Sequence, residues 1–77
     1  MMTLWDAAKG QTVRVTALDL NLNQLVSSRL REMGLDEGQS VLCLRRGPFN
    51  GPLVVAIADC VYSLEQTIAR QVHIIPT

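Results

Sequence analysis

The 77-residue chain has few of the residue types that usually carry catalysis or metal binding. It contains one histidine, two cysteines and three aromatic residues, Trp5, Phe49 and Tyr62. No apolar run approaches the roughly 20 residues that a transmembrane helix needs. The first ten residues also lack the basic and apolar regions of a signal peptide. The sequence therefore predicts a cytoplasmic protein whose two cysteines stay reduced.

An excess of charge of one sign is absent as well. Seven basic and seven acidic residues cancel to a formal net charge of zero. This balance gives no general attraction to nucleic acid or to an anionic membrane. The spacings C-x-x-C, H-x-x-x-H, E-x-x-H, G-x-S-x-G and G-x-G-x-x-G are missing too. The sequence predicts neither an enzyme nor a bound metal or other cofactor.

What is present is enough apolar surface for a packed core. The hydrophobic share is 48%, carried mainly by Leu, Val, Ile and Ala. Chains that remain disordered have much less apolar surface to bury. At this length we expect the whole chain, residues 1–77, to fold as one domain.

Alternating and β-branched stretches predict about five strands. They lie at 12–18, 39–46, 53–58, 61–64 and 72–75. In the first, Val13 and Val15 share one face, whereas the third is apolar enough to be covered on both faces. So many strands in so short a chain indicate a mainly β fold, a small closed or nearly closed barrel. Closure would remove the exposed sheet edges that promote aggregation.

One amphipathic α-helix is expected at about residues 22–33. Its apolar positions recur mostly at steps of three and four residues: Leu22, Leu25, Val26, Leu30 and Met33. Asn21 or Asn23 can cap its start. Short helical turns are expected near residues 4–9, beginning at a Thr3–Asp6 capping pair, and near 65–69.

Gly34 and Gly38 follow this helix and admit two interpretations. Glycines near a helix can cradle phosphate, but phosphate loops precede a helix, where free N–H groups face the anion. Here the glycines follow the helix, and two acidic residues lie between them. We therefore predict that Gly34 is the left-handed residue that ends the helix, with Leu35 packing back on Leu30. Gly38 then turns the chain into the next strand.

The remaining candidate ligands have simple structural interpretations. His73 lies between Val72 and Ile74 on the last predicted strand, so we expect its side chain to face solvent. Cys43 shares strand parity with Val41, so we expect it in the core, where free cysteine is common. Neither pattern predicts a metal site.

The segment 47–52, GPFNGP, is the most suggestive surface feature. A large apolar residue on a loop stiffened by prolines and flanked by arginines is typical of an anchor for a protein partner. We assign partner contact to Arg45, Arg46, Pro48, Phe49 and Pro52. Two alternatives stay open: Phe49 could fold back to plug one end of the barrel, or the arginines could bind RNA while Phe49 stacks on a base.

Taken in order, these motifs resemble the FeoA family, small cytosolic partners of the bacterial ferrous iron transporter FeoB. Its opening L-(x)5-G is matched by Leu4 and Gly10. Its central R-L-x-x-[LM]-G-L-x-x-G is matched by Arg29, Leu30, Met33, Gly34, Leu35 and Gly38. Its loop is matched by Pro48, Gly51 and Pro52, and its closing L-(x)4-A-x-x-[IV]-x-[IV] by Leu64, Ala69, Val72 and Ile74. The chain departs from the family at Phe49, where members often have a smaller aliphatic residue, and at Asp59 and Cys60, where members often have glycine.

The resemblance implies an SH3-like barrel with an inserted helix and no enzymatic activity of its own. It also implies contact with the cytosolic GTP-binding region of FeoB, in support or regulation of Fe²⁺ import. The protein would then be cytoplasmic and recruited to the inner face of the membrane by its partner, without inserting into the bilayer. The signature residues are mainly structural: Leu30, Met33, Gly34, Leu35, Gly38, Leu64 and Ala69. A nucleic-acid-binding barrel and a direct Fe²⁺-binding protein are the alternative functions, and weak self-association is left open.

Overall fold

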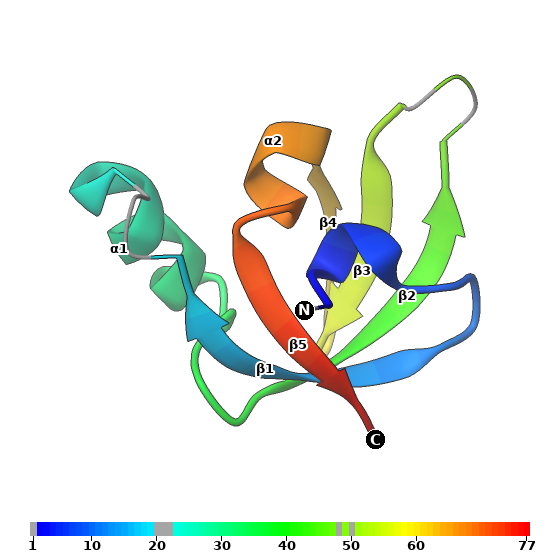
Figure 1. The fold of residues 1–77 in the computed structure, drawn as a ribbon, viewed down its shortest axis with the longest axis horizontal. Helices are drawn as coiled ribbons and strands as arrows, with labels where there is room; N and C mark the ends of the chain where they lie inside the picture. The colour runs from blue at the N-terminus through cyan, green and yellow to red at the C-terminus, as the bar shows by residue number, and fades with distance from the viewer. Residues whose placement is uncertain (1, 20–22, 48, 50) are drawn as a thin grey trace.

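Five strands and three short helical segments make up the part of the chain that the structure, a computed structural model, describes: residues 2–19, 23–47, 49 and 51–77 (Figure 1). In chain order they are η1 (Leu4–Asp6), β1 (Thr12–Leu18), α1 (Gln24–Glu32), β2 (Ser40–Arg46), β3 (Leu53–Ile57), β4 (Cys60–Leu64), α2 (Gln66–Ala69) and β5 (Val72–Pro76). The predicted mainly β fold with one inserted helix is confirmed, with differences of at most three residues at the ends of elements.

The five strands form one antiparallel sheet in the order β4-β3-β2-β1-β5. Its register shifts between Val15 and Ala17 in β1 and between Cys43 and Arg45 in β2. An extra residue at such a point bends the strand and increases its twist, so the sheet curls on itself (Figure 1). The edge strands β4 and β5 are not hydrogen-bonded neighbours. The predicted barrel is therefore strongly curled but is not closed by strand pairing.

The N-terminal segment covers the β5 edge. Thr3 forms an isolated antiparallel bridge with His73, and the Ile74 N–H donates to the Met2 carbonyl at 3.1 Å. These bonds satisfy part of the edge that a closed barrel would have paired with β4. They also bring η1 over the open end of the sheet, where Leu4 is fully buried.

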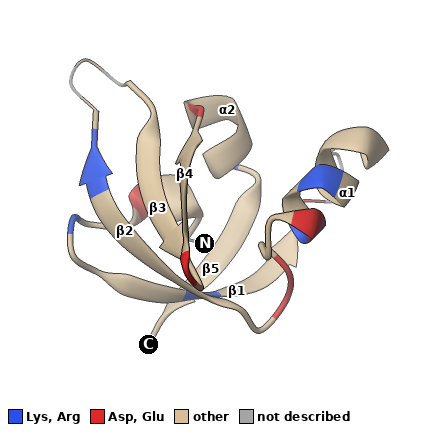
Figure 2. Cartoon of the chain, turned by 180° about the vertical axis from the view of Figure 1, so that it is seen from behind, with Lys and Arg blue, Asp and Glu red and all other residues tan. Residues whose placement is uncertain are grey.

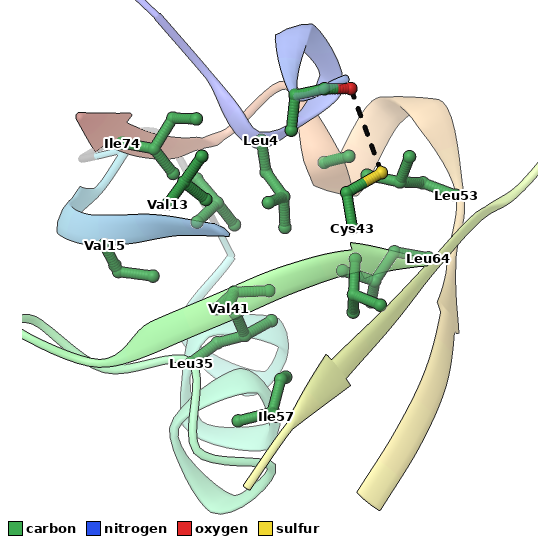
Figure 3. Close-up of a cluster of buried hydrophobic side chains, with 14 of the residues drawn as sticks. Leu4, Val13, Val15, Leu35, Val41, Cys43, Leu53, Ile57, Leu64 and Ile74 are labelled. Carbon is green, nitrogen blue, oxygen red and sulfur yellow. Dashed lines mark hydrogen bonds between the residues drawn. The ribbon is translucent and has the colours of Figure 1, made fainter. Parts of the chain in front are cut away.

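Alternation along the strands directs one face of the sheet into a single hydrophobic cluster (Figure 3). Its members are Leu4, Ala7, Val13, Val15, Leu30, Leu35, Val41, Cys43, Leu53, Val55, Ile57, Leu64, Ala69, Val72 and Ile74. The predicted inward face of β1 is confirmed at Val13 and Val15. The strand β3 buries alternate residues and leaves Val54 and Ala56 half-buried, so the prediction that both of its faces are covered is only partly right.

The helix α1 lies at one side of the sheet (Figure 1), and its C-terminal end packs on the core through Leu30 and Leu35. Asn23 caps it, because its Oδ1 accepts from the Leu25 N–H at 2.8 Å. The alternative cap Asn21 and the predicted first residue Leu22 lie outside the described residues. Along the apolar stripe, burial increases toward the end of the helix: Leu25 is 81% exposed, whereas Leu30 is buried. The stripe therefore extends beyond the contact that the sheet provides.

The helix ends as predicted. Gly34 has φ +98°, its N–H donates to the Arg31 carbonyl at 3.0 Å, and the Leu35 N–H donates to the Leu30 carbonyl at 2.9 Å. This is the pair of bonds of a Schellman motif, and both leucines are buried in the core. Gly38 has φ +86° and donates its N–H to β1, so the predicted turn into β2 is also confirmed.

The turn between β3 and β4 has an unusual backbone at an ordinary residue. Ile57 pairs with Cys60, which leaves a two-residue turn of Ala58 and Asp59. Ala58 has φ +53°, a left-handed conformation that costs a residue with a Cβ about 1–2 kcal/mol. Two-residue hairpins need such a conformation, which glycine adopts freely. Ala58 therefore carries a local backbone strain in this hairpin.

We expect Gly34→Ala to destabilise the protein by more than Gly38→Ala. Both substitutions force a Cβ into the left-handed region, at about 1–2 kcal/mol each. At Gly34 the new Cβ would also lie 2.9 Å from Ile57 Cγ2, whereas at Gly38 it would meet nothing within 4 Å. Urea denaturation of both variants measures the difference, and equal losses of stability would show that the contact with Ile57 is not tight.

We expect Ala58→Gly to stabilise the protein by up to about 1 kcal/mol, because it removes the strained φ and offsets the entropy that glycine adds to the unfolded chain. Asp59→Gly is the matched control, because Asp59 has no positive φ to relieve. Thermal denaturation should therefore give a higher Tm for the first variant and a lower Tm for the second. A lower Tm for both would contradict the assignment of strain to Ala58.

Candidate interaction surface

The loop between β2 and β3 is narrow at its base and exposes an aromatic ring at its tip. The Gly47 N–H donates to the Pro52 carbonyl at 3.0 Å, and a Cβ on Gly47 would lie 3.0 Å from the Gly51 carbonyl carbon. Phe49 is 99% exposed, so the alternative in which it plugs the barrel is wrong. Pro48 lies outside the described residues.

The backbone of Phe49 is also strained, with φ +54°. A bulky residue in the left-handed region is an outlier, and such outliers persist mainly where the surroundings or a function require them. Phe49 gives the fold no buried contact in return for this strain. Phe49 therefore destabilises the isolated protein in two ways: its backbone is strained, and its apolar ring is exposed to water.

The two arginines before this loop have different surroundings. The Arg46 guanidinium lies 4.7 Å from the centre of the Trp5 ring and donates to the Ala7 carbonyl at 2.9 Å and to the Trp5 carbonyl. It thus holds the segment around η1 against β2. Arg45 is exposed to solvent. Arg46 is also exposed to solvent, but its guanidinium is engaged by Trp5 and Ala7.

A groove that the sequence did not predict lies between α1 and the junction of β4 and α2. Its volume is about 440 Å³. It is lined by Leu25, Val26, Arg29, Leu30, Met33, Ser63, Leu64, Glu65 and Ile68. The sequence signal was the pair Leu25 and Val26, because neighbouring residues on a helix point about 100° apart and cannot both face one sheet. We call it the α1–α2 groove.

His73 is less exposed than its position in the sequence suggested. Its side chain is only 21% exposed, and its Nε2 lies 3.6 Å from Asp19 Oδ2. The prediction is only partly right: His73 lies on the face opposite to the buried Val72 and Ile74, but the N-terminal segment bridges β5 at this residue and the side chain is half-buried. His73 and Asp19 alone are too few donors for a metal site.

The two cysteines are free and lie in different environments. Cys43 is in the core, as predicted, and its Sγ lies 3.9 Å from the Ala7 carbonyl oxygen. Burial raises the pKa of the Cys43 thiol, and the positive charge of Arg46 opposes this only in part. A thiol of this kind stays protonated at neutral pH and is a poor nucleophile or metal ligand. Cys60 is exposed on β4.

Other common functional features are also missing from the described residues. They contain no group of three or more His, Cys, Asp or Glu side chains that could hold a metal ion. In the same part of the chain, no helix is long and apolar enough to span a membrane. Basic residues occur on separate elements, including β1, α1 and β2, with acidic residues among them (Figure 2). They do not form the continuous basic stripe typical of a nucleic-acid surface.

The signature residues lie in the interior or in turns. Leu30, Leu35, Leu64 and Ala69 belong to the core, Met33 packs against it, and Gly34 and Gly38 have positive φ. A match at these positions therefore identifies the fold, although Leu30, Met33 and Leu64 also line the α1–α2 groove.

Comparison with known proteins gives the same fold. The model of the FeoA domain family matches residues 2–76. No curated protein sequence matches the chain. Among solved structures, iron(II) transport protein A from Clostridium thermocellum superposes with a TM-score of 0.90 at 20% identity, covering 99% of this chain and 46% of that protein.

Two further solved structures share this fold. FeoA from Stenotrophomonas maltophilia, described as a prokaryotic SH3 domain protein and solved with zinc, has a TM-score of 0.79 at 29% identity, covering 97% of this chain and 91% of that one. ScaR with bound Zn²⁺ has a TM-score of 0.85 at 19% identity, covering all of this chain and 37% of that one. With a family match over residues 2–76 and this shared SH3-like architecture, the chain belongs to the FeoA domain family.

Proposed function

We propose that this protein is a non-enzymatic accessory module of bacterial ferrous iron uptake that binds the cytosolic GTP-binding region of FeoB. Membership of the FeoA domain family supports a role in ferrous iron transport. Binding at the cytosolic face would bring the protein to the membrane through its partner, where it would support or regulate Fe²⁺ import.

The observation that carries this proposal is the complete exposure of Phe49. Burying an aromatic ring at the centre of an interface contributes much of the binding free energy in protein complexes. The hydrogen bond between Gly47 and Pro52 closes the base of the loop, so less conformational entropy is lost when a partner binds it. The loop thus has the properties of a pre-organised anchor.

Arg45 complements this anchor electrostatically. Its charge is exposed at the end of β2, beside the loop, and can accelerate encounter with an acidic partner surface. Neither alternative function has a comparable feature in the described residues, because the basic residues are dispersed and no group of metal ligands is assembled.

We expect Phe49→Asn to weaken binding to FeoB by at least about tenfold, because it removes the apolar anchor. Asparagine tolerates a positive φ, so the loop should keep its conformation. The measurement is isothermal titration of the protein into its cognate FeoB reconstituted in nanodiscs. Ile75→Thr is the matched control, since Ile75 is 48% exposed on β5, outside the loop. Unchanged affinity in a folded Phe49→Asn variant would sink the loop assignment.

A second experiment should distinguish the role of Arg45 from that of Arg46. Arg45→Ala should slow association with FeoB, most clearly at low salt, without changing the midpoint of urea denaturation. Arg46→Ala should cost about 1–2 kcal/mol of stability, because it removes the bonds to Ala7 and Trp5 and the stacking on the indole ring. Equal stability of the two variants would contradict the role assigned to Arg46.

A further inference from the structure

We propose that this protein associates with itself head to tail, with Phe49 of one copy seated in the α1–α2 groove of the next. The proposal rests on two features of the described surface that complement each other. One is the exposed ring of Phe49, and the other is the apolar groove of about 440 Å³.

Each of these features is unfavourable in the isolated chain. Phe49 exposes 99% of its surface and has a strained backbone, and neither is compensated by a contact within the chain. At the mouth of the groove, Leu25 is 81% exposed although it belongs to the apolar stripe of α1. Seating the ring beside Leu25 and Ile68 would remove apolar surface of both copies from water.

A chain cannot make this contact with its own groove. The loop that joins β2 and β3 lies on one side of the curled sheet and α1 lies on the opposite side, in both views of the molecule (Figures 1 and 2). The contact therefore requires a second copy. Because the two contacting surfaces differ, the interface is heterologous, and each copy can use its loop and its groove at once.

The charges beside the loop and on the rim of the groove are complementary. Arg45 is exposed beside the loop, and Glu65 is exposed on the rim. When Phe49 of one copy enters the groove of the next, Arg45 of the first copy and Glu65 of the second lie at the edge of the same interface. The other charged residue of the lining is Arg29, and a guanidinium is favourable against the face of an aromatic ring. A second copy of this chain therefore complements the groove in polarity and through the pair of Arg45 and Glu65.

The association should be weak. One inserted aromatic side chain and its neighbours bury much less than the roughly 1,200–2,000 Å² of a stable protein complex. A weak contact is populated only at high local concentration, such as that produced when several copies gather at one membrane site. It would also cover Phe49 and so withdraw the loop from any other partner. The proposal does not depend on FeoB, because it is tested on this protein alone.

The first test is sedimentation equilibrium of the wild-type protein, up to about 1 mM because the contact is weak. We expect the average mass to rise with concentration. Phe49→Asn removes the inserted residue, and Leu25→Gln makes the mouth of the groove polar while keeping a good helix former. Each should raise the dissociation constant by at least about tenfold. Ile75→Thr, the control at an exposed apolar residue elsewhere, should leave it unchanged.

The second test exploits the difference between the two surfaces. The Phe49→Asn protein keeps an intact groove, and the Leu25→Gln protein keeps an intact loop. Unlabelled Leu25→Gln should therefore shift the amide resonances of Leu64 and Ile68 in ¹⁵N-labelled Phe49→Asn, whereas unlabelled Phe49→Asn should not.

Three results would overturn the proposal: a wild-type protein that stays monomeric, an association that neither variant weakens, or mixed variants that show no shifts at the groove. Shifts at the groove that appear only when FeoB is added would assign the groove to the transporter instead. Circular dichroism of each variant confirms that the fold is retained, so that loss of association reports on the interface.

Discussion

The close approach of Gly34 to Ile57 fixes the position of α1, the longest helix of the described structure. The helix α1 ends at a residue without a side chain, directly against the end of β3, and the Leu35 that follows enters the core. A residue with a Cβ at this position would have a strained left-handed backbone and would crowd the Ile57 side chain. The last turn of α1 is thereby fixed on the sheet, whereas the first turn extends past it. The α1–α2 groove is a direct result of this attachment at one end.

On the side of the molecule where β4 and β5 do not pair, the N-terminal segment covers the open sheet. Side chains and loop backbone hold this segment in place. The N-terminal segment bonds to β5 through Met2 and Thr3, and Arg46 holds the carbonyl groups after η1 against β2. In a chain that has little apolar surface to spare, this arrangement buries Leu4 and Ala7 where an open sheet would expose its core. The bonds of Arg46 thus replace part of the hydrogen bonding that β4–β5 pairing would supply in a closed barrel.

The local features of this fold could be predicted from sequence, and the tertiary ones could not. The ending of α1 and the turn at Gly38 follow from glycine spacing, because left-handed residues at helix ends are governed by neighbouring residues alone. The burial of His73 depends on the segment around Thr3, and the role of Arg46 depends on Trp5, which is 41 residues earlier in the chain. No periodicity within β2 or β5 contains that information. The groove was missed for the same reason, since it exists only when α1 and α2 are placed side by side.

The position of β1 has a consequence for the order in which the sheet can assemble during folding. Its strand neighbours are β2, which follows after one helix, and β5, which is made last among the elements described. As the chain folds, the β2–β3–β4 meander can form from contacts close in sequence, while β1 keeps one edge unpaired until β5 is added. Such long-range pairing slows folding and leaves an edge open to other chains. The pairing of β5 with β1 thus completes the sheet, and until it forms the open edge of β1 is accessible to other chains.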